Sequence, residues 1–411
     1  MGRFASSPSC HSVWRPSLIR IGFLGLVVGS AGCGPGSGSD DDAASVASTR
    51  PDVTPLPSFA LGLPLLDLDR DASRQTVVDR EPGQYLGHPT TQLLADGRTI
   101  LAVYPKGHGS GEIVYKRSPD RGRTWSERLP VPDSWATSRE VPTVYRVDRR
   151  GGGDRLLVFS GLYPIRLAHS DDEGATWSEL APIGEFGGIV AMASLHQKPD
   201  GDLIAYFHDD GRFLRDEGAP GTFSVYATRS EDDGLTWSEP WVIASRPDVD
   251  LCEPGLVSSP DGTELALLLR ENSRTKNSFV VYSSDGGETW SEPRELPAAL
   301  TGDRHTLRYA PDGRLVATFR DMAADSPTRG DWLVWVGTWR DIMSGEPGEY
   351  RVRLIDNKHE WDAAYPGLEL LPDETFVSTT YGHWTDGEEP YVVSVHFSLT
   401  ELDALLGTEV P

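Results

Sequence analysis

Cysteine, basic residues and long apolar runs are all scarce in this sequence. Its 411 residues include three cysteines, and 38 lysines and arginines stand against 62 aspartates and glutamates, so the formal net charge is −24. This acidic balance, with no long basic run, excludes a nucleic-acid partner, because phosphate backbones are bound by basic surfaces. Hydrophobic residues make up 38% and charged residues 24%, which is a globular composition rather than a disordered or membrane-spanning one.

The N-terminus carries an export signal. Arginines precede a short apolar run at 21–28, and small residues lead from that run to Cys33. These features are typical of a secretory signal peptide, here 1–32, and the run is too short for a transmembrane helix. The Ala-Gly-Cys sequence resembles the bacterial lipoprotein box, so Cys33 is predicted to be the lipidated first residue of the mature chain. The alternative is ordinary cleavage beside an incidental cysteine.

The mature chain is predicted to consist of a tether and one folded domain. Residues 33–72 begin with a Gly-, Ser- and Asp-rich stretch and are assigned to a flexible tether, and 73–411 to the domain. Because Cys10 lies in the signal and Cys33 would be lipidated, Cys252 has no disulfide partner, and we interpret it as a buried apolar residue. We expect an exported envelope lipoprotein of the bacterial outer membrane, facing the periplasm or the outside, attached to the membrane only through its lipid.

A repeated motif indicates the architecture. Segments with the pattern Ser-x-Asp-x-Gly-x-Thr-Trp begin at Ser118, Ser170, Ser230 and Ser283, which are 52, 60 and 53 residues apart. In such a box the Asp carboxylate accepts hydrogen bonds from its own loop, the Gly takes a left-handed conformation and the Trp ring is buried between sheets. We favour this turn over a metal-binding or catalytic role for the four aspartates.

A second marker alternates with the boxes. Hairpin turns between two apolar, strand-like runs occur at Asp96, Gly152, Asp200, Asp261, Asp312 and Asp373. Six hairpins at this period, the first four each followed by a box, indicate six units of about four strands. We therefore predict an all-β fold, a six-bladed β-propeller with four Asp-box turns, and a monomer.

The strand order predicts where a site can lie. If the strands of each blade run up and down from the axis outward, both markers lie on one rim. The starts of the first and third strands and the ends of the second strands then converge on the opposite rim. The polar residues at these positions include His88, Glu140, Glu253, Arg304, His305, Tyr365, His108, His208, Asp209, Asp210, Arg270, Arg320, Asp321, Tyr381, His383, Glu112, Arg166 and Arg329. Such a ring indicates a site for a charged or polyhydroxylated ligand.

The boxes and the six-unit period resemble the sialidase (neuraminidase) superfamily, over roughly residues 80–400. Three local matches carry this resemblance more specifically. Glu253 in Cys-Glu-Pro, with Arg270 ending the hairpin that follows, is similar to the blade that carries the family's catalytic glutamate and second arginine. Arg329 in Ser-Pro-Thr-Arg resembles the third-arginine strand, and Tyr365 in Ala-Tyr-Pro resembles the nucleophilic-tyrosine strand.

The resemblance implies an exo-acting glycoside hydrolase that releases terminal sialic or related acidic sugars with retention. Tyr365 would be the nucleophile and Glu253 its base, since a phenol with a pKa of about 10 needs one. A neutral nucleophile suits a substrate that carries its own carboxylate, and Arg270 and Arg329 would bind that carboxylate through their guanidinium forks. No cofactor and no metal is implied.

The sequence departs from the family in its first blade. Where the family has Tyr-Arg-Ile-Pro and its first arginine, this chain has Tyr-Leu-Gly-His-Pro, which places His88 at or near that position. His88 is a candidate replacement, and Arg304 or Arg320 is a candidate compensating cation. Asp321, next to Arg320, is a further candidate for substrate binding.

The family's acid/base aspartate has no clear counterpart either. In the corresponding loop the candidates are His108 and Glu112, each of which can exchange a proton near neutral pH if its surroundings adjust its pKa. Asp209, on another blade, is a third candidate. Each of the three can also be an ordinary loop or strand-end residue.

Two other functions stay open at this point. One is a non-catalytic glycan-binding propeller on a lipid anchor, and the other is a divergent hydrolase or lyase that acts on another anionic polysaccharide. The pairing of Tyr365 with Glu253 favours an enzyme, because binding alone needs no paired base and phenol. The altered position of His88 favours the divergent enzyme. A glycan is the partner in every case.

The lipid anchor leads to a first prediction. The substitution Cys33→Ala should move the protein from the membrane fraction to the soluble fraction, because it removes the lipidation site. Cell fractionation followed by immunoblotting measures this, with Cys252→Ala as the control that stays with the membrane. A Cys33→Ala protein that is as membrane-bound as the wild type contradicts the anchor.

Overall fold

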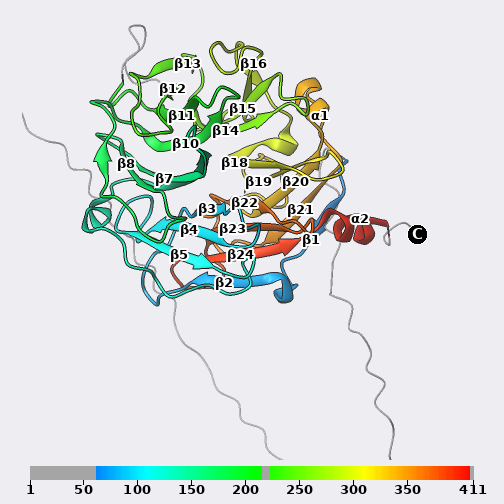
Figure 1. Cartoon of the computed structure of the whole chain (residues 1–411). Helices are drawn as coiled ribbons and strands as arrows, with labels where there is room; N and C mark the ends of the chain where they lie inside the picture. The colour runs from blue at the N-terminus through cyan, green and yellow to red at the C-terminus, as the bar shows by residue number, and fades with distance from the viewer. Residues whose placement is uncertain (1–61, 215–222, 408–411) are drawn as a thin grey trace, which may run out of the picture. The chain divides into compact units, whose positions relative to one another are not determined.

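The computed structural model describes residues 62–214 and 223–407, which lie in a compact unit that spans residues 50–411. The described residues form six β-sheets arranged around a common axis (Figure 1). The predicted all-β, six-bladed propeller is thereby confirmed. The predicted signal peptide and Cys33 fall outside the described residues.

Each sheet is one blade, and its strands run antiparallel from the axis outward. The first blade consists of β3 (Thr90–Leu93), β4 (Ile100–Pro105) and β5 (Ile113–Ser118). The second consists of β6 (Thr143–Asp148), β7 (Asp154–Ser160), β8 (Arg166–Ser170) and β9 (Ala181–Pro182). The third consists of β10 (Ile189–Gln197), β11 (Leu203–Asp209), β12 (Ser224–Ser230) and β13 (Trp241–Ser245). The next two are β14 (Leu251–Ser258), β15 (Leu265–Glu271), β16 (Phe279–Ser283) and β17 (Arg294–Glu295); and β18 (Gly302–Tyr309), β19 (Leu315–Asp321), β20 (Trp332–Gly337) and β21 (Tyr350–Ile355).

The N-terminal part of the described chain completes the ring. The sixth blade consists of β22 (Gly367–Leu370), β23 (Phe376–Gly382), β24 (Tyr391–Phe397) and, as its outer strand, β2 (Gln75–Asp79). Figure 1 shows β2, in blue, beside β24, in red. In addition, β1 (Leu65–Asp67) pairs parallel with β21 at the edge of the fifth blade. Folded structure therefore begins before residue 73, where the sequence analysis ended the tether: the apolar Leu65 and Leu66 are buried in that edge.

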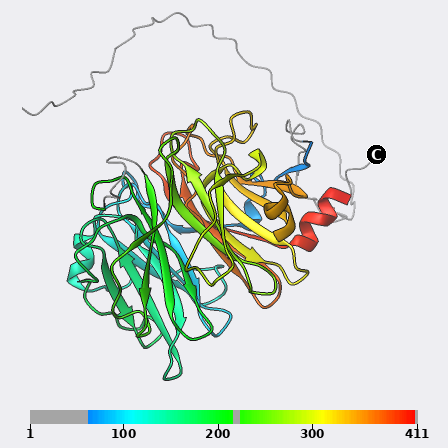
Figure 2. The same ribbon diagram turned by 90° about the horizontal axis from the view of Figure 1, so that it is seen from above.

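Short helices lie in the connections and at the C-terminal end. The α-helices of the described residues are α1 (Trp339–Ser344) and α2 (Leu399–Gly407), and the 3-10 helices are η1 (Ala72–Arg74), η2 (Asp133–Thr137) and η3 (Ala298–Leu300). Figure 2 shows α2 at the outer edge of the sheets, away from the axis. Across residues 62–214 and 223–407, no helix has the length and apolar character to cross a bilayer, and no cluster of three or more His, Cys, Asp or Glu side chains is placed to hold a metal ion.

The four boxes form the predicted turns. In the second box the Asp172 carboxylate accepts hydrogen bonds from the backbone N–H of Thr176 (2.9 Å) and from its hydroxyl, while the Ser170 hydroxyl accepts from the N–H of Gly174 (2.9 Å). The same bonds recur in the other three boxes. The bonds from Thr176 lower the pKa of Asp172 to about 2. The carboxylate of the box aspartate is therefore engaged within its own turn, which is the role that the motif predicts for it.

The apolar faces of neighbouring sheets form the core, and the box tryptophans extend it. Trp237 is 9% exposed, lies edge-on to Phe159 of the preceding blade with ring centroids 5.4 Å apart, and donates from Nε1 to the carbonyl of Gly234 (2.9 Å). Each box thus connects its own blade to a neighbour.

This packing leads to a second prediction. Trp237→Ala should lower the free energy of unfolding by about 3–5 kcal/mol, because it empties a buried aromatic site. Activity per folded molecule should not change, since the boxes lie on the rim opposite to the starts of the inner strands. Denaturant unfolding measures the loss, with Leu235→Ala in the same turn (42% exposed) as the nearly neutral control. A Trp237→Ala protein that is stable but inactive would show that the functional rim is misassigned.

Candidate active site

Residues in the left-handed conformation mark the starts of the inner strands. Non-glycine residues with positive φ near these starts include His88 (53°), Val190 (45°), Met192 (52°), Glu253 (52°), Arg304 (55°) and Ala364 (56°). In the fourth and fifth blades the strand register shifts at the same place, between Cys252 and Gly255 and between Asp303 and Thr306. Such bulges redirect side chains, and non-glycine residues with positive φ are concentrated at functional sites.

A cavity of about 250 Å³ lies where these strand starts meet. It is lined by His88, His108, Arg270, Arg274, Arg320, Met322, Trp361, Tyr365 and Tyr381. The strand register puts the starts of the inner strands and the ends of the second strands on one rim and the boxes on the other. The cavity therefore opens on the rim at which the sequence analysis placed the site.

Tyr365 and Arg270 line this cavity, and both contact the buried Glu253. The Tyr365 hydroxyl donates to Oε1 of Glu253, which is 3% exposed. Nη1 of Arg270 donates to the same Glu253 oxygen (2.6 Å) and to the Tyr365 hydroxyl oxygen (2.9 Å). Burial, and next the charge of Glu253, raise the pKa of Tyr365 well above its usual value, so the phenol is protonated until a base takes the proton. The carboxylate of Glu253 is the base in contact with it.

Three arginines of the cavity are held by one carboxylate that the sequence analysis missed. Asp303 has no exposed surface, and it accepts from Nε of Arg320 (2.8 Å) and from Nη2 of Arg274 (2.7 Å). Nε of Arg270 lies 3.3 Å from the same carboxylate. Burial opposes the charge of Asp303, but the guanidinium groups of Arg270, Arg320 and Arg274 outweigh burial and hold its pKa well below the usual range. Three positive charges thus surround one buried negative charge.

A second polar network lies on another side of the cavity, around Asp362, which the sequence analysis also missed. Its Oδ1 accepts from the hydroxyls of Tyr85 (2.7 Å) and Tyr381 (3.1 Å) and lies 3.2 Å from Nδ1 of His108. His88 lies within 3.1 Å of the Tyr381 hydroxyl. Burial lowers the pKa of His88 well below its usual value, so this imidazole is neutral and brings no positive charge to the position where the family has its first arginine.

Two predicted arginines lie outside this cavity. Arg329 is exposed, donates to the carbonyl of Met322 (2.6 Å) and lines a neighbouring hollow of about 190 Å³. Arg304 is buried, donates to the carbonyl of Ala193 (2.6 Å) and lines a second, larger cavity that is described below. The arginines that line the cavity beside Arg270 are Arg320, one of the candidate compensating cations, and Arg274, which the sequence analysis did not name.

Three predicted carboxylates also lie apart from the cavity lining. Glu112 pairs with Lys106 (3.2 Å) at the surface. Asp209 caps a turn by accepting from the N–H groups of residues 211, 213 and 214 (2.9–3.1 Å). Asp321 is buried against Arg351 (2.5 Å). Neither Asp209 nor Asp321 lines the cavity, and each is bonded to backbone or structural partners.

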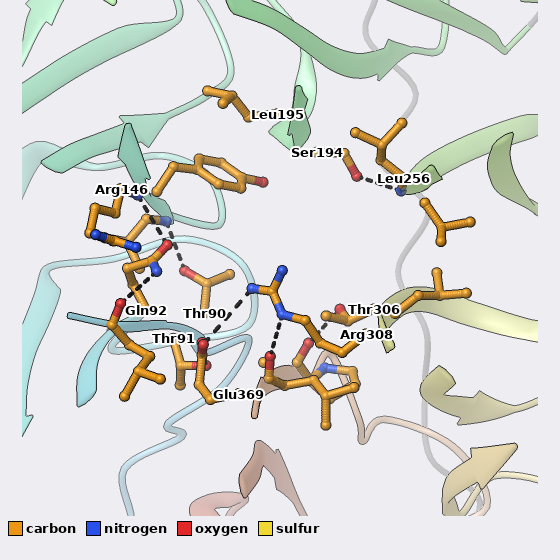
Figure 3. A pocket seen from close by; sticks show the side chains of 18 of the residues that line it. Thr90, Thr91, Gln92, Arg146, Ser194, Leu195, Leu256, Thr306, Arg308 and Glu369 are labelled. Carbon is orange, nitrogen blue, oxygen red and sulfur yellow. Dashed lines mark hydrogen bonds and ion pairs between the residues drawn. The ribbon is translucent and has the colours of Figure 1, made fainter. Parts of the chain in front are cut away.

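A larger cavity of about 610 Å³ is lined by the inner strands of all six blades (Figure 3). Figure 3 shows Arg308 and Glu369, from neighbouring inner strands, pointing toward one another on one side of this cavity. Nη2 of Arg308 lies 3.8 Å from Oε2 of Glu369. Glu369 also accepts from the Thr91 hydroxyl (2.8 Å), and Arg308 donates to the carbonyl of Leu368 (3.1 Å). These charges are used in joining inner strands of the first, fifth and sixth blades. Tyr365, which contacts Glu253, lines the smaller cavity, which is therefore the candidate active site.

Comparisons with known proteins agree with this fold. The family described as BNR repeat-like domain matches residues 71–250 and 159–373. A sialidase of Micromonospora viridifaciens is 26% identical over 329 residues, which are 70% of this chain and 47% of that protein. Among solved structures, an α-L-arabinanase of Penicillium chrysogenum has a TM-score of 0.59 at 17% identity and covers 80% of this chain and 98% of its own.

The NanB sialidase of Streptococcus pneumoniae has a TM-score of 0.55 at 13% identity, with 80% of this chain and 71% of that one covered. At these identities the solved structures show a shared fold. The chain spans about half the length of the first curated relatives it matches.

The arginine cluster leads to a third prediction. Asp303→Asn should destabilise the protein at pH 7 by about 3–5 kcal/mol, because it leaves the buried Arg320 and the partly buried Arg270 and Arg274 without their shared counter-charge. The folded-state pKa of Asp303 lies below its ordinary value of 3.8, so its contribution is complete above about pH 4 and declines as the pH falls further. Urea unfolding of both proteins from pH 7 to pH 2.5 should show the gap narrowing only below pH 4. A gap that does not depend on pH would contradict the ionised Asp303.

Proposed function

The chain belongs to the BNR repeat-like domain family and is a divergent member of the sialidase superfamily, and from this we propose that it is an exo-acting glycoside hydrolase. The single observation that carries the proposal is the contact of the Tyr365 hydroxyl, at a cavity that Tyr365 and Arg270 line, with Glu253, which also bonds Arg270. A phenol paired with a buried carboxylate is an activated nucleophile. Binding alone does not require one.

The proposed reaction retains the configuration of the sugar in two steps. Glu253 removes the phenolic proton as the Tyr365 oxygen attacks the anomeric carbon, and the bond to the leaving-group oxygen breaks with its electron pair. His108, which lines the same cavity, gives that oxygen a proton. In the second step His108 takes a proton from water, the water oxygen attacks the anomeric carbon, and Tyr365 leaves and recovers its proton from Glu253.

We propose a terminal sialic or related acidic sugar as the substrate. Arg270, Arg274 and Arg320 line the cavity, whereas the carboxylates that balance their charge, among them Asp303 and Glu253, are not part of its lining. Guanidinium forks at the cavity surface favour a carboxylate on the substrate. A cavity of about 250 Å³ is smaller than the roughly 300–1,000 Å³ of most ligand pockets, which suits the terminal unit of a glycan.

The alternatives differ in substrate or in having no reaction at all. A neutral sugar is one, because α-L-arabinofuranosidase activity occurs in proteins with this fold. Another anionic polysaccharide, cut by hydrolysis or elimination, is a second, and glycan binding without turnover is a third. The proposed chemistry uses only side chains of the chain and calls for no cofactor. We propose the setting expected from the sequence: an exported, monomeric envelope lipoprotein.

The nucleophile assignment leads to a fourth prediction. Tyr365→Phe removes the attacking oxygen but keeps the buried ring, so kcat should fall by several orders of magnitude with Tm nearly unchanged. Glu253→Gln should impair the same step, because an amide cannot accept the phenolic proton. The double variant should lose little more than either single one, since the two residues act as a unit.

Initial rates on fluorogenic glycosides of sialic acid, uronic acids and arabinofuranose measure these effects and identify the sugar. Arg329→Ala, which changes a side chain outside the cavity, is the matched control. Full activity in Tyr365→Phe contradicts the mechanism. Binding of a glycan array with no turnover of any substrate favours the binding protein.

A further inference from the structure

Asp362 is held in an unusual position beside the cavity. It lies in the connection between β21 and β22 with φ of 76°, in the left-handed region that non-glycine residues rarely adopt. It is 7% exposed, and its carboxylate receives hydrogen bonds from the hydroxyls of Tyr85 (2.7 Å) and Tyr381 (3.1 Å). Nε2 of His383 lies 3.5 Å from its other oxygen. These partners hold the strained backbone conformation of Asp362 in place, which is typical of positioning residues at functional sites.

The Asp362 side chain is a carboxylate throughout the physiological range. Burial opposes its charge, but hydrogen bonds involving His108 and Tyr85 and the charge interaction with His108 prevail, and they hold its pKa well below the usual value. Asp362 therefore accepts hydrogen bonds and gives up no proton. Asp362 can therefore affect a proton transfer only through a neighbouring side chain.

That neighbour is His108. Its ring lines the cavity with Tyr365, and its Nδ1 lies 2.7 Å from the Tyr85 oxygen and 3.2 Å from Oδ1 of Asp362. Since Tyr85 donates its own proton to Asp362, its oxygen is free to accept one from Nδ1 of His108. Both partners thus favour a proton on Nδ1. Nε2 is then the ring nitrogen left for a ligand.

The other groups around His108 are compatible with this role. His88 packs edge-on to it, with ring centroids 4.9 Å apart, and its pKa is lowered well below the usual value by burial, so it adds no charge. Glu140, on the second blade, interacts electrostatically with His108, and burial raises the pKa of Glu140 to about 7. Lys106 and Glu112, on the loop of His108 itself, neutralise one another. Arg270, Arg274 and Arg320 line the same cavity.

We propose that Asp362, together with Tyr85, is the positioning residue that orients His108 as the proton donor to the leaving group. Nε2 of His108 passes its proton to the glycosidic oxygen as the carbon–oxygen bond breaks and leaves its electron pair on that oxygen. The Nδ1 proton remains in its bond to the Tyr85–Asp362 pair, which stabilises the positive charge that the ring carries before the transfer. This assignment rests on the proposed glycosidase function, and it names the residue that orients His108, the general acid of that reaction.

The experiment compares two leaving groups on the sugar that the substrate panel identifies. Dinitrophenol leaves without a proton, whereas a simple alcohol needs one. On the alcohol glycoside, His108→Ala and Asp362→Asn should lower kcat/KM by roughly 10²–10⁴-fold, the usual contribution of general acid catalysis. On the dinitrophenyl glycoside the loss should be less than about tenfold, and the double variant should lose no more than His108→Ala alone.

Several outcomes overturn the proposal. Equal losses of Asp362→Asn on both substrates would mean a merely structural role. Leaving-group dependence in Glu112→Gln or Glu140→Gln, but not in Asp362→Asn, would move the acid to that carboxylate. Asp386→Asn, an exposed carboxylate in the nearby 383–388 loop, is the matched control and should change neither rate.

A second measurement does not depend on activity, and so separates a failure of this assignment from a failure of the proposed function. Nitrogen-15 NMR of the full chain reports which ring nitrogen of neutral His108 carries the proton. We expect Nδ1 in the wild type and a mixture of tautomers in Asp362→Asn. A proton on Nε2 in the wild type would overturn the positioning role even if the enzyme is active. If the proton is on Nδ1 of His108 but no sugar is turned over, the contact of Asp362 with His108 is supported and the glycosidase function is refuted.

Discussion

A single buried carboxylate organises the candidate active site. Three guanidinium groups cannot be brought together away from water unless a counter-charge compensates them, because desolvation and mutual repulsion both oppose it. Asp303 supplies that charge through contacts with Arg270, Arg274 and Arg320. Arg270 in turn bonds both Glu253 and Tyr365. The orientation of the nucleophile and its base therefore depends on Asp303, and so does the placement of the three arginines that line the cavity.

The propeller makes this arrangement possible by bringing distant parts of the chain to one rim. Glu253 and Tyr365 are 112 residues apart and begin inner strands of different blades. At those strand starts, left-handed residues and register shifts interrupt the regular alternation of side chains. These interruptions store strain, and the closed ring of sheets stabilises them. The boxes keep the opposite rim packed and take no part in the chemistry.

The sequence was sufficient to predict the fold and the centre of the site, but not the groups that support it. The period of the boxes and hairpins determines the number of blades, and strand order places Tyr365, Glu253 and Arg270 on one rim. Asp303 was missed because the bulge in β18 moves the inward position from the expected Arg304 to its neighbour.

Arg274 and Asp362 lie in irregular connections, where no periodicity assigns a side chain to a face. Asp209, a candidate acid or base, and Asp321, a candidate for substrate binding, both bond structural partners. A polar residue at a strand end has the same sequence signature in either role, so the sequence does not separate the two. Arg329 follows the family motif, yet its loop turns the side chain toward Met322.

The central claim is that Tyr365 forms a covalent bond to the sugar, and the most direct test is to trap that bond. The protein would be incubated with a fluorinated sialosyl inactivator, digested, and its labelled peptide sequenced by mass spectrometry. The account predicts one sialosyl group, attached to Tyr365, and no label in Tyr365→Phe. A label on any other residue, or turnover of a sialoside with no trapped intermediate at all, would contradict it.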